Sequence, residues 1–549
     1  MLVPARYRPA LDLDRLIQRG GPGEAATPLD VVFVGGGPAG LAGAIRLAQL
    51  VREDAAAGHP AGNVEIGVLE KAASLGEHSL SGAVVDARPF RRLFPELADG
   101  EFPFAGPVPG ERVLWLTEQR GFRLPTPREM RNHGNFVASI CDIVRWLGQR
   151  AEELGVNVFA GFPAEALLVD GQGVVGVRTT PSGLGRDGSP ARDFVPPNDL
   201  SARVTVLADG TRSSLAQAWT RWQGIDGANP QIYALGVKEL WRVPRRLDAV
   251  IHTLGWPLPG DAFGGGWIYP MGDDGISLGL VVGLDYRKHT LDVHELTQRF
   301  KQHPFVAGLL EGGELLEWGA KTIPEGGFHA LPERLHGDGL LVVGDAAGLV
   351  NVAALKGIHY AMHSGILAAE AIHRALREGD TSAGALASYD RELRSSYVLD
   401  DLRRTRNMRL AFKSGFLAGG LKAWLMDLTR GIFPGGRIAT LEDAEEPRRL
   451  SPAAPFRPDG RRTFSKVDAV FRSGNATRDD IPSHLQVGTD IPPELAEFYE
   501  HLCPAGVYER NGDTLVVNAP NCIDCKATDV VGPRWTPREG GSGPAYKRM

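Results

Sequence analysis

The sequence has few cysteines, no long apolar run and no excess of basic residues. Its 549 residues include only four cysteines, too few for a disulfide framework. No segment reaches the roughly 18 uncharged apolar residues of a membrane-spanning helix, and the N-terminal segment lacks the apolar core of a signal peptide. The net charge of −6 gives no general attraction to nucleic acid, which we do not expect as a partner. These absences indicate a reducing compartment and no spanning helix.

The cysteines that are present gather near the C-terminus. Cys503, Cys522 and Cys525 fall within 23 residues. The C-x-x-C spacing of the last two suits either zinc or an iron–sulfur cluster. A second C-x-x-C pair, which would favour structural zinc, is absent from the sequence. Residues 447–470 are rich in proline and arginine and are predicted to link this tail to the rest of the chain.

A nucleotide-binding motif lies near the other end of the chain. Gly35, Gly37 and Gly40 form G-x-G-x-x-G between a buried-strand pattern and a helical pattern. The first glycine permits a tight turn, the second lets the backbone approach a pyrophosphate, and the third lets the helix pack on the strand. The helix N-terminus would then face the phosphates with unpaired N–H groups.

The next predicted strand, residues 64–72, carries Glu70, whose carboxylate can accept hydrogen bonds from adenosine ribose hydroxyls. It lies 30 residues after Gly40, more than the typical spacing of about 20. We therefore expect the first helix or the loop after it to be extended. No second G-x-G-x-x-G opens another βαβ unit, which argues against a dedicated NAD(P)H domain.

Two later segments each have a strand pattern that ends in an adjacent aspartate and glycine. Residues 204–214 end their strand at Asp209 and Gly210, and residues 338–376 combine a strand with a long helix. Together with the first motif, these segments resemble the three-part signature of FAD-binding proteins in the glutathione-reductase and hydroxylase superfamily.

That resemblance implies roles for the last segment. Gly344 and Asp345 would contact the ribityl and pyrophosphate region of FAD. The helix that starts near Gly357 would point its positive end at the isoalloxazine ring, which favours the reduced, anionic flavin.

Glycines and aromatic residues combine in the middle of the chain. The segment "FGGGWIYP" sets Gly264 and Gly265 beside Trp267 and Tyr269. In the same superfamily such an insert forms a sheet over the flavin and carries the substrate pocket, where glycine backbone can approach a flat ligand. The alternative is an ordinary hairpin with a loose turn.

Two segments have the apolar and basic character of membrane-interface elements. Residues 111–125 are a predicted hairpin with Trp115 and Phe122, and residues 411–433 contain an apolar helical face (Trp424, Leu425, Leu428 and Ile432). Such elements can lie in the interface with their basic groups near lipid head groups. The alternative is that both pack on the protein core.

The segments "HTLGWPL", "GLVVGLDY", "KGIHYAMHSGILAAE", "CPAGVYE", "NAPNCIDCK" and "GGSGPAY" occur in this order. From about residue 29 onward the chain resembles the electron transfer flavoprotein–ubiquinone oxidoreductase family. The resemblance implies a peripheral membrane protein with FAD, one iron–sulfur cluster and a quinone pocket. It would take electrons from electron transfer flavoprotein at the cytoplasmic face of a bacterial inner membrane, or on the matrix side of the mitochondrial one.

The resemblance also implies site residues. Cys503, Cys522 and Cys525 match cluster cysteines, and Gly264 and Gly265 match backbone that approaches the quinone. The segments at 111–125 and 411–433 match the membrane-facing elements. No side chain is assigned as a general acid or base, because the cofactors carry the chemistry.

The expected fold class is α/β, with a Rossmann-like FAD domain, an inserted β-rich quinone domain and a ferredoxin-like tail. The expected divisions are an N-terminal extension at 1–29, the FAD-binding domain at 30–215 and 335–446, the quinone-binding domain at 216–334, and the linker and iron–sulfur domain at 447–549.

The sequence departs from the family at Thr528, where the family has a fourth cysteine. We therefore expect either a [4Fe-4S] cluster with a non-cysteine fourth ligand or a [3Fe-4S] cluster. Asp529 is the nearest acidic group, and water or hydroxide could also fill the position. Cys141 belongs to a helical pattern in the flavin region and is not assumed to replace the missing thiol.

Two other functions fit parts of the sequence. One is a flavin-dependent isoprenoid (geranylgeranyl) reductase or monooxygenase-like enzyme with a degenerate ferredoxin tail. The other is a non-enzymatic electron-transfer scaffold whose tail holds no metal. The ferredoxin-like tail counts against the first, and the three clustered cysteines count against the second.

Overall fold

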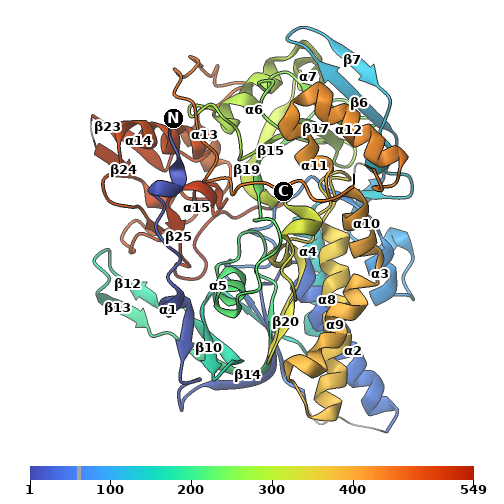
Figure 1. Cartoon of the computed structure of the whole chain (residues 1–549), viewed down its shortest axis with the longest axis vertical. Helices are drawn as coiled ribbons and strands as arrows, with labels where there is room; N and C mark the ends of the chain where they lie inside the picture. The colour runs from blue at the N-terminus through green and yellow to red at the C-terminus, as the bar shows by residue number, and fades with distance from the viewer. Residues whose placement is uncertain (59–63, 434, 513) are drawn as a thin grey trace.

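The computed structural model describes residues 1–58, 64–433, 435–512 and 514–549. Its lower part is built on a nine-stranded sheet (Figure 1). The strand order is β1-β10-β11-β14-β2-β3-β9, with β21 beside β14 and β20 beside β21. The strands are β1 (Ile17–Arg19), β2 (Thr27–Val34), β3 (Ile66–Glu70), β9 (Asn157–Ala160), β10 (Ala164–Asp170), β11 (Gly173–Thr179), β14 (Asp199–Leu207), β20 (His336–Gly337) and β21 (Leu340–Val342).

The centre of this sheet is parallel and apolar, because helices cover it. Strands β14, β2 and β3 run parallel, and residues 31–34 at the end of β2 are buried. The principal helices are α2 (Pro38–Ala56), α4 (Ile140–Glu153), α5 (Ser214–Gln223), α8 (Ile358–Glu378), α9 (Ala383–Arg394) and α10 (Tyr397–Thr405). Helix α2 has 19 residues, which accounts for part of the long Gly40–Glu70 spacing; the loop that follows lies partly outside the described residues.

Helices α2 and α8 meet through small residues. A Cβ on Gly365 of α8 would lie 2.1 Å from the carbonyl oxygen of Ala39 in α2. A Cβ on Gly43 of α2 would lie 3.0 Å from the carbonyl oxygen of Gly365. The two backbones can approach this closely only because neither glycine carries a side chain. This contact fixes the start of α8 relative to the nucleotide turn.

A seven-stranded sheet forms the upper part of the molecule, in the order β19-β15-β18-β17-β16-β6-β7 (Figure 1). Its strands are β6 (Glu111–Leu116), β7 (Gly121–Leu124), β15 (Tyr233–Arg242), β16 (Val250–Gly255), β17 (Gly264–Pro270), β18 (Gly275–Gly283) and β19 (Glu314–Pro324). The hairpin predicted at 111–125 is therefore an edge of this sheet, because β6 pairs in parallel with β16.

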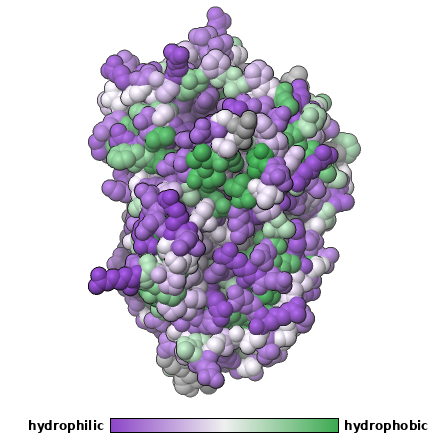
Figure 2. Space-filling model, turned by 90° about the vertical axis from the view of Figure 1, so that its left-hand side faces the viewer, coloured by the Kyte–Doolittle hydropathy of each residue, from purple (hydrophilic) through white to green (hydrophobic). Residues whose placement is uncertain are grey.

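The C-terminal segment packs against one end of this sheet, at the left of Figure 1. Its elements are α13 (Lys466–Phe471), β22 (Leu485–Gln486), α14 (Pro493–Leu502), β23 (Tyr508–Asn511), β24 (Thr514–Val517), α15 (Ala527–Val531) and β25 (Arg534–Trp535). The face that carries it is largely hydrophilic around a hydrophobic area (Figure 2). The N-terminal residues are part of the fold as well: β1 pairs with β10, and Leu2 bridges Arg448.

The segment at 411–433 is broken rather than one continuous helix. It comprises the end of α11 (Met408–Ala411), a 3-10 turn and α12 (Phe416–Leu428). Its exposed apolar side chains include Leu421, Trp424, Leu428, Ile432 and Phe433, whose exposed fractions lie between 57% and 79%. Among the described residues, no helix combines the length and the apolar character needed to cross a membrane.

The upper sheet holds a fully buried ion pair, which generates a stability prediction. Lys301, on α6 (Val293–Gln302), lies 2.8 Å from the Glu239 carboxylate of β15, and both side chains are 0% exposed. Lys301→Met leaves that carboxylate without its cation, so unfolding should become easier by about 3–5 kcal/mol. Urea unfolding followed by tryptophan fluorescence measures the change. Adding Glu239→Gln should recover part of the loss; equal stability of Lys301→Met and wild type would contradict the prediction.

Candidate functional site

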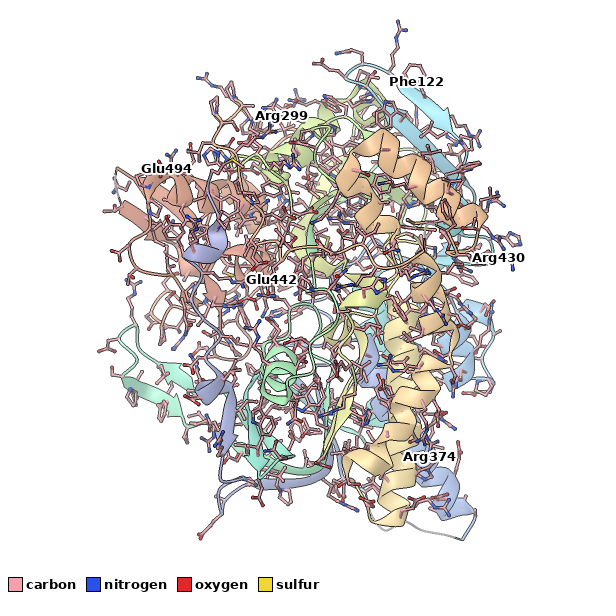
Figure 3. The ribbon with its side chains drawn as sticks, viewed as in Figure 1. Phe122, Arg299, Arg374, Arg430, Glu442 and Glu494 are labelled. Carbon is pink, nitrogen blue, oxygen red and sulfur yellow. The ribbon has the colours of Figure 1, made fainter. Side chains whose placement is uncertain are left out.

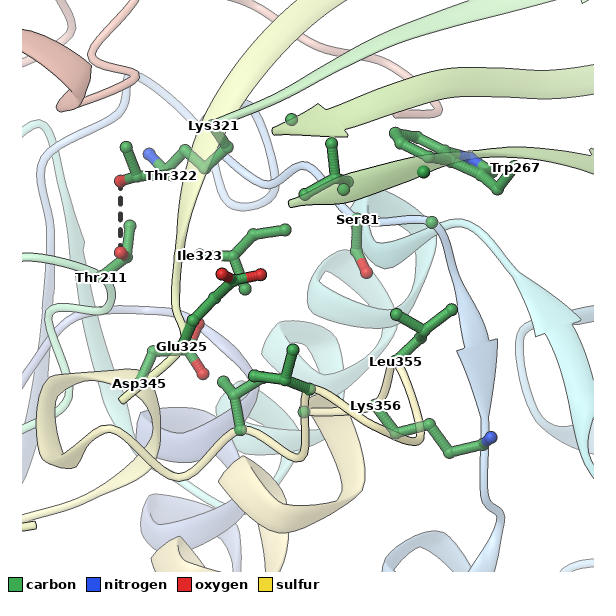
Figure 4. A pocket seen from close by; sticks show the side chains of 18 of the residues that line it. Ser81, Thr211, Trp267, Lys321, Thr322, Ile323, Glu325, Asp345, Leu355 and Lys356 are labelled. Atoms are coloured by element: carbon green, nitrogen blue, oxygen red, sulfur yellow. Dashed lines mark hydrogen bonds between the residues drawn. The ribbon is translucent and has the colours of Figure 1, made fainter. Parts of the chain in front are cut away.

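One large cavity connects the nucleotide turn with the upper sheet. Its volume is about 1340 Å³, and its lining comes from both sheets, from α8, from α12 and from the C-terminal segment. Figure 4 shows part of it, with Asp345 and Glu325 on one side and Trp267 and Lys356 on another. All the predicted FAD and quinone residues except Gly40 and Gly344 line this cavity.

The glycines of the nucleotide turn serve two different purposes. Gly35 has a φ of +116°, and a Cβ there would lie 2.4 Å from the carbonyl oxygen of Ala208. A Cβ on Gly40 would lie 2.1 Å from the carbonyl oxygen of Gly35. At Gly37, the N-cap of α2, a Cβ meets nothing within 4 Å. Gly35 and Gly40 are thus required by the protein's own packing, whereas Gly37 leaves room on the cavity side.

Three carboxylates surround this part of the cavity. Glu70 accepts backbone hydrogen bonds from Gly36, at 3.1 Å, and Ala72, at 2.8 Å, so its position is fixed. Asp209 has a buried oxygen without a partner, and burial raises its pKa. Burial also raises the pKa of Asp345, to about 6. The buried Asp209 oxygen without a partner fits a ligand that donates a hydroxyl hydrogen bond.

Helix α8 begins where the third sequence motif predicted it. Gly357 is its N-cap and lines the cavity. A Cβ on Gly357 would lie 3.8 Å from an Asp345 oxygen, so the third motif and the helix start are adjacent. The positive end of a helix of 21 residues therefore faces the cavity.

The glycines of β17 lie where the cavity meets the upper sheet. A Cβ on Gly264 would lie 2.0 Å from the carbonyl oxygen of Val281, and one on Gly265 would lie 2.7 Å from that of Thr253. They therefore form a regular strand packed closely between two neighbours, not the loose turn of the alternative interpretation. The same backbone lines the cavity.

Tyr269, which the sequence set beside these glycines, has a buried partner that the sequence patterns did not single out, His252. The His252 ring Nε2 is 2.6 Å from the Tyr269 hydroxyl, and both residues line the cavity. Burial lowers the pKa of His252 to about 3 and raises that of Tyr269. The pair is therefore neutral around pH 7.

The cavity also reaches the elements that were expected to face a membrane. Gly420, Ala423, Trp424 and Asp427 of α12 line it, as do Trp115 and Leu116 of β6. Phe122 of the neighbouring hairpin strand β7 is 51% exposed and projects outward (Figure 3). The apolar side chains of α12 thus stand on the surface where the cavity lining ends.

A second, small cavity brings together the predicted cluster cysteines. Cys503, Cys522, Cys525 and Thr528 all line it. All three thiols are buried, and burial raises the pKa of each, that of Cys522 to about 12. Buried thiols without a nearby base are poor nucleophiles. They fit a metal cluster, whose positive charge favours the thiolate form.

The two side chains considered as replacements for the fourth cysteine are engaged elsewhere. Asp529 accepts from Arg212 Nε at 2.8 Å and, through its other oxygen, from the Trp535 backbone N–H at 2.8 Å. It is therefore not a free oxygen ligand. The Cys141 thiol donates to the carbonyl oxygens of Ser79 and Met549 and does not line the cluster cavity.

Two residues that the sequence did not single out join the two cavities. Lys526 and Trp535 line both. The Lys526 ammonium lies 3.1 Å from the centre of the Trp535 indole ring, a cation–π contact. Burial and the neighbouring Lys71 lower the pKa of Lys526 to about 7. Only its position directly after Cys525 could have drawn attention to it.

Asp524 sits between the two C-x-x-C cysteines in a cage of donors. Its carboxylate lies 2.5 Å from Lys71 Nζ, 3.0 Å from Arg538 Nη2 and 3.0 Å from Trp535 Nε1. Burial alone raises the pKa of Asp524, but Arg538 and Lys71 outweigh it and hold the pKa well below its usual value. His484 lies near Cys522 and Asp524, with ligand atoms within 4.8 Å of one another. Because the Asp524 oxygens are already occupied, these three do not form a separate metal site.

Two solved structures share much of this fold. A geranylgeranyl bacteriochlorophyll reductase-like protein from Thermoplasma acidophilum covers 74% of this chain and 92% of its own, with a TM-score of 0.57 and 21% identity. A flavin-dependent brominase covers 73% of this chain and 94% of its own, with a TM-score of 0.50 and 20% identity. At these identities the likeness concerns the fold alone, which is that of FAD-dependent oxidoreductases.

Two family models and the curated relatives define the family. "ETF-QO, ubiquinone-binding" matches residues 233–323, and "Electron transfer flavoprotein-ubiquinone oxidoreductase, 4Fe-4S" matches residues 460–547. Mitochondrial proteins named electron transfer flavoprotein-ubiquinone oxidoreductase are 38% identical in Oryza sativa and 36% in Homo sapiens. They match 96% and 95% of this chain, and 94% and 90% of their own length. The chain belongs to the electron transfer flavoprotein-ubiquinone oxidoreductase family, as its sequence motifs predicted.

The Asp524 cage generates a prediction about the cysteine loop. Lys71→Met removes one donor from a buried carboxylate, so the loop should be destabilised by roughly 1–3 kcal/mol. Hydrogen exchange of residues 520–535 should become faster. Lys547→Met, at an exposed side chain, serves as the control and should leave the exchange unchanged. Identical protection in both variants would contradict a structural role for the Lys71–Asp524 pair.

Proposed function

We propose that this protein transfers electrons from reduced electron transfer flavoprotein, through FAD and an iron–sulfur cluster, to a membrane quinone. The observation that carries the proposal is the arrangement of the two cavities. One cavity runs from the nucleotide glycines past Gly264 to α12, and it shares Lys526 and Trp535 with the cysteine cavity. Sites for two cofactors and an apolar acceptor thus adjoin one another in a single chain.

The lining of the large cavity indicates which residues would hold FAD. The backbone at Gly35 and Gly37 and the N-terminus of α2 would receive the pyrophosphate, and Glu70 the ribose hydroxyls. Asp209, Gly210 and the Gly344–Asp345 turn would contact the remainder of the dinucleotide. The N-terminus of α8 at Gly357 would favour negative charge on the flavin ring.

Bound FAD supplies two-electron chemistry, and a bound cluster supplies single-electron transfer between the flavin and a protein partner. Cys503, Cys522 and Cys525 would hold the cluster by three thiolates. Lys526 and Trp535, which line both cavities, would lie between the cluster and the flavin. Strand β19 supports the cysteine loop through a hydrogen bond from the Thr322 N–H to the Cys525 carbonyl oxygen, at 2.9 Å.

The quinone would reach Gly264 and Gly265 from the surface at α12. The exposed apolar side chains of α12 and β7 would rest in the outer layer of a membrane, with Lys422 and Arg430 near the lipid head groups. We infer peripheral attachment, at the cytoplasmic face of a bacterial inner membrane or at the matrix side of a mitochondrial one.

The competing functions lack comparable support. The likeness to a geranylgeranyl reductase-like protein covers 74% of the chain at 21% identity and concerns the fold. The 4Fe-4S family model covers residues 460–547, and three of the four expected cysteines are present there and face one cavity. A degenerate tail without metal has no comparable reason to keep them together.

The function and the flavin site are tested together. Gly37→Val places a branched side chain where the backbone approaches the pyrophosphate, so the purified variant should lose FAD. Wild type with reduced electron transfer flavoprotein should reduce a soluble ubiquinone analogue, and the variant should lose at least about 99% of that rate. Flavin absorbance and quinone reduction measure the two effects.

The matched control is Gly100→Val, because a Cβ on Gly100 also meets nothing within 4 Å and the position is exposed. This variant should keep its flavin and its rate of quinone reduction. A colourless, well-folded wild type would overturn the flavin site. A yellow wild type that passes no electrons to any quinone would overturn the acceptor.

Membrane attachment is tested on α12. Trp424→Glu combined with Leu428→Glu removes two exposed apolar side chains, each contributing roughly 1.5–3 kcal/mol when withdrawn from water. Membrane-bound protein should fall at least about tenfold, with FAD retained, and wild type should be released by detergent rather than salt. Glutamates at Val467 and Phe471, which are 59% and 84% exposed on α13, are the control. If both double variants bind the membrane equally well, α12 is not a membrane-binding surface.

A further inference from the structure

The cysteine cavity has three thiol corners and one corner of different chemistry. Cys503 is the C-cap of α14, and Cys522 and Cys525 lie in the loop before α15. Thr528, in the first turn of α15, also lines this cavity and is 9% exposed. Its hydroxyl accepts a hydrogen bond from the Tyr508 hydroxyl at 3.5 Å. This corner therefore holds two neutral hydroxyl groups and no thiol.

Within the described part of the chain, no anionic side chain is free to serve this corner. Both Asp529 oxygens are taken, by Arg212 and by the Trp535 backbone. Asp524 is enclosed by Lys71, Arg538 and Trp535. A threonine hydroxyl is a weak iron ligand, because its pKa is far too high for it to ionise beside three thiolates.

The imidazole of His484 is a neutral side chain close to one of these cysteines. His484 is 3% exposed, and its Nε2 has no hydrogen-bond partner. One of its ring nitrogens lies within 4.8 Å of the Cys522 sulfur. The imidazole does not line the cysteine cavity, however, and Trp535, whose ring packs edge-on against it, does. His484 is therefore near Cys522 but is not part of the cavity lining to which Thr528 belongs.

We propose that the cluster of this chain has one iron without a protein ligand, located at the Thr528–Tyr508 corner. That iron carries an exchangeable small ligand and can be removed and restored while the other three stay bound to cysteine. The proposal rests on the cluster of the proposed function and specifies its fourth position.

The exchange can be written as a balanced reaction. One equivalent of ferricyanide takes one electron from [4Fe-4S]²⁺, which releases Fe²⁺ and leaves [3Fe-4S]⁺; ferricyanide becomes ferrocyanide. In reverse, one electron from dithionite and one added Fe²⁺ restore [4Fe-4S]²⁺. No sulfide or thiolate leaves in either direction, because the three cysteines hold the remaining irons.

The experiment uses the full chain, purified anaerobically with its flavin, and measures iron, labile sulfide and the EPR spectrum. Ferricyanide should remove one iron of four, keep all the sulfide and produce the EPR signal of an oxidised [3Fe-4S] cluster. Fe²⁺ with dithionite should restore the fourth iron and abolish this EPR signal. Protein isolated with three irons that accepts the fourth supports the proposal equally.

Two variants at one position identify the corner. Thr528→Cys supplies the missing thiolate, so the fourth iron should resist ferricyanide. Thr528→Val keeps the shape but removes the hydroxyl, and it should exchange iron as wild type does. His484→Gln should also leave the exchange unchanged.

Three results would overturn the inference. The first is four irons in wild type that resist ferricyanide, since a protein ligand would then hold the fourth. The second is exchange that Thr528→Cys does not suppress, which would place the open iron at another corner. The third is absence of iron from the purified protein, which would also remove the cluster from the proposed function; the first two leave that function intact.

Discussion

The contact between Asp524 and its cations holds the two cofactor-binding regions together. Asp524 is 1% exposed, and a carboxylate so deeply buried is costly unless cations and donors surround it. One cation, Lys71, directly follows the Glu70 strand end of the nucleotide sheet, and the other, Arg538, belongs to the C-terminal segment. The cysteine loop also adopts a left-handed backbone at Asp524 and Lys526, with φ of +54° and +67°. Such conformations persist where surrounding contacts determine them, and the cage supplies those contacts.

Strand β19 connects the cysteine loop to the large cavity. Lys321 and Thr322 of β19 line the large cavity and also bind the cysteine loop, through the carbonyl oxygens of Asp524 and Cys525. The Thr322 hydroxyl lies 3.2 Å from that of Thr211, close to the Asp209–Gly210 turn (Figure 4). Strand β19 thus ties the cysteine loop to the lining of the large cavity.

Features fixed by local sequence could be predicted, and features fixed by distant contacts could not. The turn at Gly35, Gly37 and Gly40 carries a local glycine pattern, although Gly35 also packs against the distant Ala208, and Gly357 marks the start of α8. The Lys71–Asp524 pair joins residues 453 positions apart, and no periodicity reports such a pair. The β6–β7 hairpin was assigned to the flavin region by chain order, whereas its parallel pairing with β16 places it on the upper sheet. Nothing in residues 111–125 specifies that partner.

The Thr528 corner shows why adjacency in sequence is a weak guide to ligation. Successive residues of a helix point about 100° apart, so Asp529 turns to Arg212 while Thr528 faces the cysteine cavity. The cysteine loop keeps its shape without a fourth thiol, because the Asp524 cage and the hydrogen bonds to β19 do not involve the side chain of residue 528. Threonine in place of cysteine therefore removes a thiol from the cavity lining and leaves those contacts in place. The fold tolerates the substitution because the groups that support the loop belong to other residues.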